Sequence, residues 1–173
     1  MNPSALFNLS YGVYVVSTWD EGRPTGCIAN SAMQITSAPA TIAVSINHDN
    51  YTNLCIKNSG RFAISVLGEN SQPGLIGTFG FQSGRSVNKF DEVEHAVKGY
   101  LPVVADACAY IACEVIDQME TDTHTVFLGK VSVNILGDAH TQPFETRPLS
   151  FCIVPYGRIF QFPLPSTVVA PNL

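Results

Sequence analysis

The stretch TGCIANSAMQITSAP, residues 25–39, begins and ends like a buried β-strand but carries Ala29, Asn30 and Ser31 in its middle. The apolar and β-branched residues on either side favour a strand. Small and amide-bearing side chains pack poorly inside a strand and leave hydrogen-bonding groups to satisfy. Two explanations are open at this point. Either the core is loosely packed here, or something that is not protein lies against the strand.

The composition predicts one globular domain over residues 1–173, because domains commonly contain roughly 100–200 residues. Hydrophobic residues make up 46% of the chain and charged residues only 13%, against about 25% charged residues in typical soluble domains. So few charges predict that part of the surface is covered, most simply by a second copy of the chain. The net charge of −5 argues against a nucleic acid or an anionic membrane as a partner.

The five cysteines are odd in number and form no CxxC pair, and no His-rich spacing suggests a metal site. The start MNPSALFNLS lacks the basic and long apolar regions of a signal peptide. No apolar run reaches the roughly 20 residues that span a bilayer. These features predict a cytoplasmic protein with reduced, mostly buried thiols, no bound metal and no membrane segment.

Strand signals dominate the chain, and helical signals are short. The turn cluster DEGRP at 20–24 predicts a hairpin between the first two strands. Asn50 and Gly60 are expected to cap one helix, and Ser71 followed by Pro73 to start another; residues 2–9 are a third candidate. The expected strands are 11–19, 25–36, 41–47, 61–67, 107–118, 124–136 and 149–157. This pattern predicts a mainly β fold, a closed or partly closed antiparallel barrel with a few short peripheral helices.

The common catalytic signatures are missing from the sequence. We find no GxGxxG after a strand, no GxxxxGK[ST], no HExxH and no GxSxG. The histidines stand in no hydrolase signature, and the carboxylates are scattered. An enzyme of this kind would therefore depend on a bound cofactor for its chemistry.

Polar clusters stand where the expected strands end. A short helix that begins near Asn50 would present free N–H groups to an anion such as phosphate. Thr52 would add a hydroxyl group, and Arg85 and Lys89 would add positive charge from a glycine-rich loop. The clusters comprise residues 29–31, 45–52, 83–89 and 122–125.

Each of these residues also has an ordinary structural explanation. Asn30 would equally mark a β-bulge, and Thr52 would equally be a plain residue of a helix's first turn. Arg85 and Lys89 would equally be solvated loop charges, and His124 would equally be satisfied by backbone groups. Only the joint pattern points to a ligand.

That joint pattern resembles the flavin reductase-like family of FMN-binding split β-barrels, which are Greek-key antiparallel barrels. The resemblance rests on ordered blocks between about residues 10 and 136, and it is closest to the branch with flavoredoxins and the flavin domain of high-molecular-weight rubredoxins. It implies a homodimer that binds FMN non-covalently near the subunit interface. The blocks are GVYVVST, GCIANSAMQITSAPATIAVSIN, DNYT, NSGRFAISVL, FGFQSGR and HTVFLGKV.

The resemblance also implies roles for individual residues. The block at 29–31 would lie along the isoalloxazine ring and ribityl chain, and the block at 45–47 would add backbone and side-chain contacts. Thr52 would lie near the phosphate, and His124 would face the open side of the flavin, where nicotinamide stacks. The implied cofactor-binding residues are Ala29, Asn30, Ser31, Ser45, Ile46, Asn47, Thr52, Phe81, Arg85 and Lys89, with Arg85 and Lys89 as charge partners of the phosphate.

The implied reaction is hydride transfer from NADH or NADPH to the bound flavin, followed by electron transfer to free flavin, a rubredoxin-like redox protein or oxygen. An electron-carrier module fed by a protein partner is the alternative, and a barrel that has lost FMN is a third. The C-terminal arm at about 155–173 departs from the family because Ile159, Phe160 and Phe162 lie amid prolines. The arm is expected to pack on the partner subunit or to cover the flavin.

Overall fold

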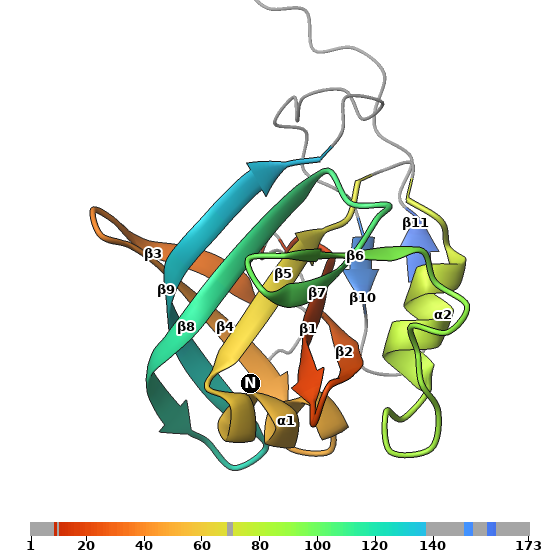
Figure 1. The fold of residues 1–173 in the computed structure, drawn as a ribbon, viewed down its shortest axis with the longest axis horizontal. Helices are drawn as coiled ribbons and strands as arrows, with labels where there is room; N and C mark the ends of the chain where they lie inside the picture. The colour runs from red at the N-terminus through yellow and green to blue at the C-terminus, as the bar shows by residue number, and fades with distance from the viewer. Residues whose placement is uncertain (1–8, 10, 69–70, 138–150, 154–158, 162–173) are drawn as a thin grey trace, which may run out of the picture.

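A computed structural model describes residue 9, residues 11–68 and 71–137, and the strand backbones at 151–153 and 159–161. Its centre is a seven-stranded antiparallel sheet in the order β2-β1-β5-β8-β9-β4-β3, which curls into a barrel (Figure 1). The strands of this sheet are β1 (Tyr14–Asp20), β2 (Arg23–Ala29), β3 (Ala32–Ser37), β4 (Ala40–Asn47), β5 (Arg61–Val66), β8 (Ala109–Glu120) and β9 (His124–Leu136).

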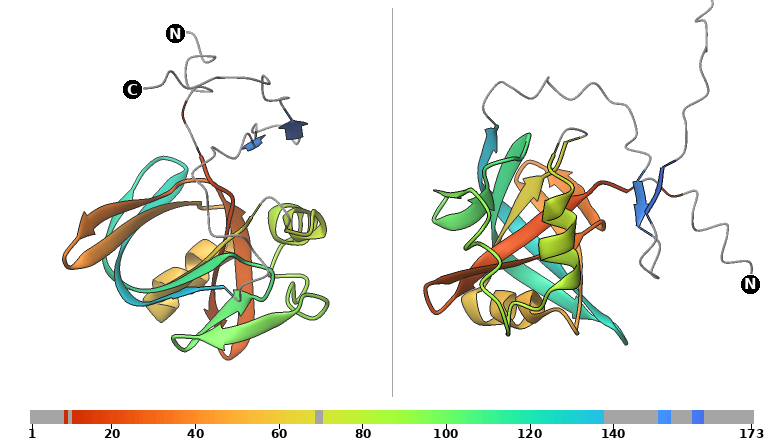
Figure 2. Two further views of the ribbon diagram at one scale, coloured as in Figure 1. Left: turned by 90° about the horizontal axis from the view of Figure 1, so that it is seen from above. Right: turned by 90° about the vertical axis from the view of Figure 1, so that its right-hand side faces the viewer.

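Two smaller hairpins and two helices complete the described elements. The hairpins pair β6 (His95–Lys98) with β7 (Leu101–Val104) and β10 (Phe151–Ile153) with β11 (Ile159–Gln161). The helices are α1 (Tyr51–Ser59) and α2 (Gly74–Phe81). From above, α1 lies within the outline of the barrel and α2 lies outside it (Figure 2). The mainly β fold that the sequence predicts is confirmed, although the β6–β7 hairpin was not expected.

The expected strand at 25–36 is in fact two strands. β2 ends at Ala29 and pairs with β1, whereas β3 begins at Ala32 and pairs with β4 at the opposite edge of the sheet. Asn30 and Ser31 therefore carry the chain from one edge to the other, and the barrel closes there without a ladder between β2 and β3. The strand prediction ran through this point because apolar residues resume directly after Ser31.

The predicted β1–β2 hairpin and the predicted boundaries of α1 are confirmed. Glu21 and Gly22 adopt φ values of 49° and 90° in the hairpin turn, as the tight turns of hairpins require. Gly60 ends α1 in the left-handed region with φ 65°, and its N–H donates to Ile56 O at 2.9 Å. Glycine adopts this conformation without the steric cost that a Cβ atom brings.

The second helix begins later than the sequence predicts. Ser71 does not cap it, because its hydroxyl group donates to Asp106 O at 2.9 Å and accepts from the Gly68 N–H at 3.0 Å. α2 starts at Gly74, after Pro73. The expected helix at 2–9 lies outside the described residues. So does most of the expected strand at 149–157 and of the expected arm at 155–173.

Strand β5 is buried on both faces, so the barrel is packed inside and out. Phe62 and Ile64 belong to a core cluster enclosed by the strands and closed at one end by α1. Ala63 and Leu67 belong to a second cluster, covered by α2 and the β6–β7 hairpin. The alternation predicted for residues 61–67 is correct, but neither face is solvated. Within the described residues, no helix has the length and apolar character to cross a membrane.

Candidate functional site

The chain turns sharply between β4 and α1 and leaves the start of α1 uncapped. Asn47 Oδ1 accepts a hydrogen bond from the Asp49 N–H at 2.8 Å, which forms the turn. Asn50 stands at the N-cap position, but its side chain makes no capping hydrogen bond. No acidic residue lies in the first turn. The partial positive charge and free N–H groups at this end therefore favour an anionic ligand.

Arg85 lies beside the same helix end. Its guanidinium carbon is 4.8 Å from the centroid of the Tyr51 ring, and Tyr51 is the first residue of α1. The loop that carries Arg85 is held by Arg23, which donates to Gly84 O at 3.0 Å. An uncapped helix end and an exposed guanidinium group thus lie together, as an anion site requires.

The loop that carries Arg85 can lie this close to Thr25 and Tyr51 only because residue 84 is a glycine. A Cβ atom on Gly84 would lie 2.6 Å from Thr25 Oγ1 and 3.2 Å from the Tyr51 ring. Thr25 is 2% exposed, and its hydroxyl oxygen is the one buried side-chain polar atom without a partner among the described residues. Such a group costs about 1–3 kcal/mol when left unsatisfied. The hydroxyl group of Thr25 is therefore left without a partner beneath the loop, at a place where only glycine fits as residue 84.

The break between β2 and β3 lies next to the outer face of β4. The Ser45 N–H donates to Ser31 O at 3.0 Å, and Ser31 Oγ donates to Asn30 Oδ1 at 2.9 Å. Ser45 and Asn47 alternate with buried residues of β4, so both side chains are on the outside of the barrel. In the β4–β9 pairing Asn47 lies opposite His124. The structure therefore brings Asn30, Ser31, Ser45, Asn47 and His124 together along one outer strip.

Three other predicted residues face the interior. Ala29 and Ile46 are buried in the core within the barrel, so Ile46 presents only its backbone, and its carbonyl accepts from Asn53 Nδ2 at 2.9 Å. Thr52 is 1% exposed, and its hydroxyl group hydrogen-bonds the Cys27 thiol. Thr52 is therefore engaged with the core rather than with the uncapped helix end.

Lys89 and Phe81 have different contacts from those expected. Lys89 is 4% exposed, and its Nζ donates to Gly26 O at 2.9 Å and to Phe79 O at 3.1 Å. Burial lowers the pKa of its ammonium group. Phe81 is at the exposed end of α2, and no described hydrogen bond or ring contact joins it to the other predicted residues. The structure groups neither residue with Arg85.

A polar network around Glu120 braces the turn, and sequence reasoning did not find it. Glu120 Oε2 lies 3.0 Å from His48 Nε2 and accepts from Thr125 Oγ1 at 3.0 Å. Its other oxygen lies 2.9 Å from Lys57 Nζ. Asn53 Nδ2 donates to Thr125 Oγ1 at 3.0 Å. Lys57 above all holds the pKa of the Glu120 carboxyl below its usual value. The polar clusters predicted at 45–52 and 122–125 contain His48 and Thr125, whereas Lys57 and Glu120 stand in no predicted cluster.

The protein's own groups suit binding better than covalent or metal chemistry. Burial raises the pKa of the Cys27 thiol to about 11 and that of Cys113 to about 12, so neither thiol forms a nucleophilic thiolate at neutral pH. His124 Nδ1 lies 2.8 Å from Thr123 Oγ1, whereas its Nε2 makes no described hydrogen bond. The described residues include no group of His, Cys, Asp or Glu that would hold a metal ion.

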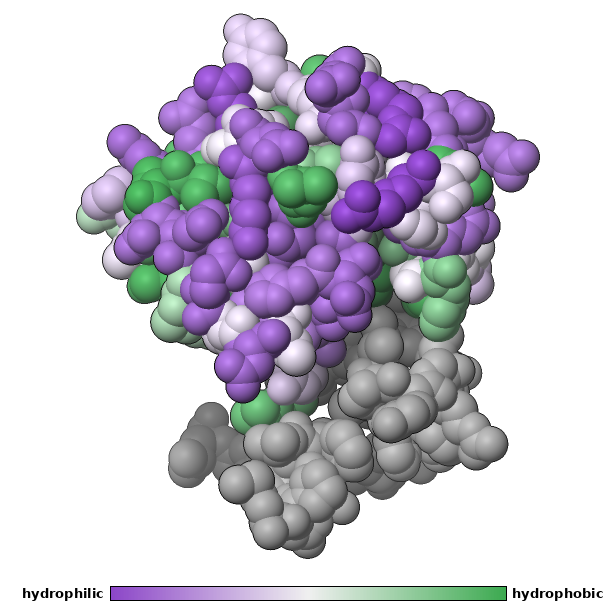
Figure 3. Space-filling model, turned by 90° about the horizontal axis from the view of Figure 1, so that it is seen from below, coloured by the Kyte–Doolittle hydropathy of each residue, from purple (hydrophilic) through white to green (hydrophobic). Residues whose placement is uncertain are grey.

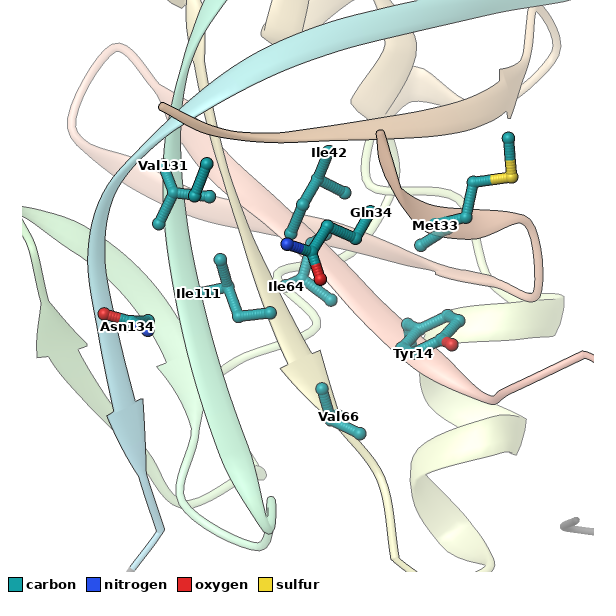
Figure 4. A pocket seen from close by; sticks show the side chains of 11 residues that line it. Tyr14, Met33, Gln34, Ile42, Ile64, Val66, Ile111, Val131 and Asn134 are labelled. Carbon is teal, nitrogen blue, oxygen red and sulfur yellow. The ribbon is translucent and has the colours of Figure 1, made fainter. Parts of the chain in front are cut away.

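A separate cavity of about 320 Å³ opens at the other end of the barrel. Ala40 begins β4 and Val66 ends β5, so these lining residues are at the strand ends far from α1. Figure 4 shows Ile64, Ile111 and Val131 turned towards it. Its walls are mainly apolar and include none of the predicted site residues. The end of the barrel where α1 lies is by contrast largely hydrophilic (Figure 3), so we assign the candidate site to that end.

The domain that contains the polar strip and the helix end is similar to known proteins along most of its length. A family model described as "Flavin reductase like domain" matches residues 6–152. The chain is 39% identical over 142 residues to a ferric-chelate reductase (NAD(P)H) of Archaeoglobus fulgidus, covering 80% of this chain and 84% of that protein. It is 40% identical over 134 residues to a high molecular weight rubredoxin of Moorella thermoacetica, covering 76% of this chain but only 58% of that protein.

A solved structure agrees with these sequence matches. The flavin reductase PheA2 in its native state superimposes with a TM-score of 0.69 at 28% identity, covering 80% of this chain and 90% of that one. The matched family region contains every element of the barrel and every residue of the candidate site. The chain therefore belongs to the flavin reductase-like family, and its fold is the split barrel of that family.

Proposed function

We propose that the protein is an FMN-dependent oxidoreductase in which NAD(P)H reduces the bound flavin and the electrons pass to a downstream acceptor. The observation that carries this proposal is the uncapped start of α1 with the Arg85 guanidinium held 4.8 Å above the Tyr51 ring. A phosphate group pairs with arginine and with free helix N–H groups together. Thr25, with its spare buried hydroxyl group, supports the same assignment.

The residues on the outer strip would hold the flavin ring. Asn30 and Ser31 stand at the strand break, where small side chains leave the backbone accessible, and Ser45 and Asn47 present polar groups on the adjacent strand. When bound, FMN supplies a ring that accepts a hydride. The chain's own contribution is orientation, which is worth about 7–11 kcal/mol at best. No side-chain base is needed for that step.

His124 is the residue that we propose next to the nicotinamide. It lies opposite Asn47 and keeps Nε2 open, because Nδ1 is engaged by Thr123. His124→Ala is therefore expected to slow flavin reduction by NADH more than it weakens FMN binding. Stopped-flow absorbance and a flavin titration would separate the two effects. Equal reduction rates in the variant and the wild type would remove His124 from the mechanism.

A second subunit is the partner that we propose for the outer sheet face. Met119 is 60% exposed and lies opposite Val126, which lies opposite Ser45 in the next strand pair. Met33 on β3 is 65% exposed on the same side. This row of exposed apolar side chains ends at the outer strip that would hold the flavin. The arrangement supports a homodimer with the site close to its interface. A rubredoxin-like protein is a proposed acceptor, since one relative is a rubredoxin of high molecular weight.

The reducing cytoplasm is the compartment that we propose, in keeping with the four free described cysteines.

The decisive experiment is an anaerobic titration of the purified, FMN-loaded protein with NADH or NADPH, followed by visible absorbance. Rapid bleaching of the flavin bands would support the reductase. Bound flavin that remains oxidised would favour the alternative, an electron carrier reduced by a protein partner. A chain that does not retain FMN would contradict both.

A further inference from the structure

We infer, on the basis of the flavin site proposed above, that Tyr51 and Asp20 are positioning residues that hold Arg85 ready for the phosphate group. Together they would make the site selective for a flavin phosphate over the uncharged flavin nucleoside. Asp20 is the last residue of β1, and Tyr51 is the first residue of α1.

The Tyr51 ring is fixed at both ends. Its backbone begins α1, and its hydroxyl group donates to Asp20 Oδ2 at 3.0 Å. The ring therefore has little freedom to turn away from the loop that carries Arg85. A Cβ atom on Gly84 would lie 3.2 Å from this ring, which shows how closely the loop passes.

Arg85 rests on the face of that ring and is otherwise uncommitted. The guanidinium carbon is 4.8 Å from the ring centroid, within the range of a cation–π contact. No described residue forms an ion pair or a side-chain hydrogen bond with this guanidinium group. Stacking restricts the side chain's rotamers before a ligand arrives, and all five N–H donors stay available for a phosphate.

Arg23 completes the arrangement by removing a charge that would oppose the ligand. It lies 2.6 Å from Asp20 Oδ2 and also donates to Gly84 O. Its guanidinium group holds the pKa of the Asp20 carboxyl below its usual value. Asp20 thus stays ionised as the acceptor for Tyr51, but its charge is balanced by Arg23. Arg23 therefore pairs with Asp20, whereas no described carboxylate balances the positive charge of Arg85.

The test compares FMN with riboflavin, which has the same ring and no phosphate. Dissociation constants are measured by flavin fluorescence on the purified full-length protein. Tyr51→Leu removes the platform and is expected to weaken FMN binding about 5–20-fold, while riboflavin binding changes less than about twofold. Tyr51→Phe keeps the ring but loses the Asp20 bond, so a smaller selective loss of about 2–5-fold is expected. These factors follow from the loss of the cation–π contact and of the ordering that it imposes on the arginine.

A double variant distinguishes positioning from general damage. If Tyr51 acts through Arg85, then Tyr51→Leu combined with Arg85→Met binds FMN no more weakly than Arg85→Met alone. Leu54→Ala, an exposed change on the same helix, serves as the matched control and is expected to affect neither flavin.

The outcomes separate the inference from the function it builds on. Equal weakening of FMN and riboflavin by Tyr51→Leu would show a merely structural role and overturn the inference, and so would unchanged FMN affinity. Additive losses in the double variant would also overturn it. A wild-type protein that binds neither flavin would instead contradict the proposed function, and the inference would fall with it. Circular dichroism and melting temperature would show that each variant is folded.

Discussion

Replacing Lys89 by methionine tests whether this residue stabilises the fold or contacts the cofactor. The change keeps most of the apolar stem but removes the ammonium group, which donates to Gly26 O and Phe79 O from a site that is 4% exposed. These two bonds join β2 to the last turn of α2. Methionine leaves both carbonyl groups without this donor.

The expected loss of stability follows from those two contacts. Hydrogen bonds from a charged donor contribute about 1.5–3 kcal/mol each. Part of that sum is offset because the variant no longer buries an ammonium group, a cost that the lowered pKa of Lys89 reflects. We therefore expect Lys89→Met to lower the free energy of unfolding by about 2–4 kcal/mol. For a chain of this size the melting temperature would fall by roughly 5–15 °C.

The assay is urea unfolding followed by tryptophan fluorescence, with Lys130→Met as the control. Lys130 is on the exposed part of β9 and forms no described ion pair, so its replacement should change stability by less than about 0.5 kcal/mol. A loss below about 1 kcal/mol for Lys89→Met would refute the reasoning. FMN affinity, measured well below the melting temperature, should change less than about threefold. A tenfold loss would instead restore Lys89 as a phosphate contact.

Two further predictions concern packing and pH. A Cβ atom on Gly129 would lie 2.6 Å from the Phe62 ring, so Gly129→Ala should lower the free energy of unfolding by about 1–3 kcal/mol through overpacking. Gly77 has open space around it, so the control Gly77→Ala should cause no loss of stability in thermal melts. Equal losses in the two variants would contradict the packing around Gly129. Lys57 holds the pKa of Glu120 below its usual 4.5, so the stability that Glu120 contributes is present above that value and is lost as pH falls through the folded pKa. Glu120→Gln should therefore lower the melting temperature at pH 7, by an amount that shrinks as the pH falls below 4.5, and a deficit that stays constant across an acid titration would exclude this ion pair as its cause.

Local patterns in the sequence were enough to predict most of the barrel. The strand at 124–136 and the helix ended by Gly60 were predicted at the boundaries that the structure gives, since alternation and a left-handed cap are properties of neighbouring residues. The division of 25–36 into β2 and β3 was missed because it is set by which strands pair at each edge of the sheet. The β6–β7 hairpin was missed because its strands have four residues each, too few for a clear period.

The candidate site was predictable in part for the same reason. Polar residues that interrupt an apolar run stand out, as at Asn30, and they meet in space once the barrel closes. The direction of a long side chain is not a local property. Lys89 and Arg85 are both basic residues of one loop, yet one reaches into the interior and the other lies over Tyr51.

The burial of β5 on both faces has a consequence for how the molecule opens. Backbone amides in Phe62–Ser65 are covered by one hydrophobic cluster on each side and by β1 and β8 at their edges. Their hydrogens should exchange with solvent deuterium only when the whole domain unfolds. The loop around Arg85 is exposed, so its amides should exchange through small local openings. The slowest amides would therefore report global stability, and the loop amides would independently report whether the anion site is filled.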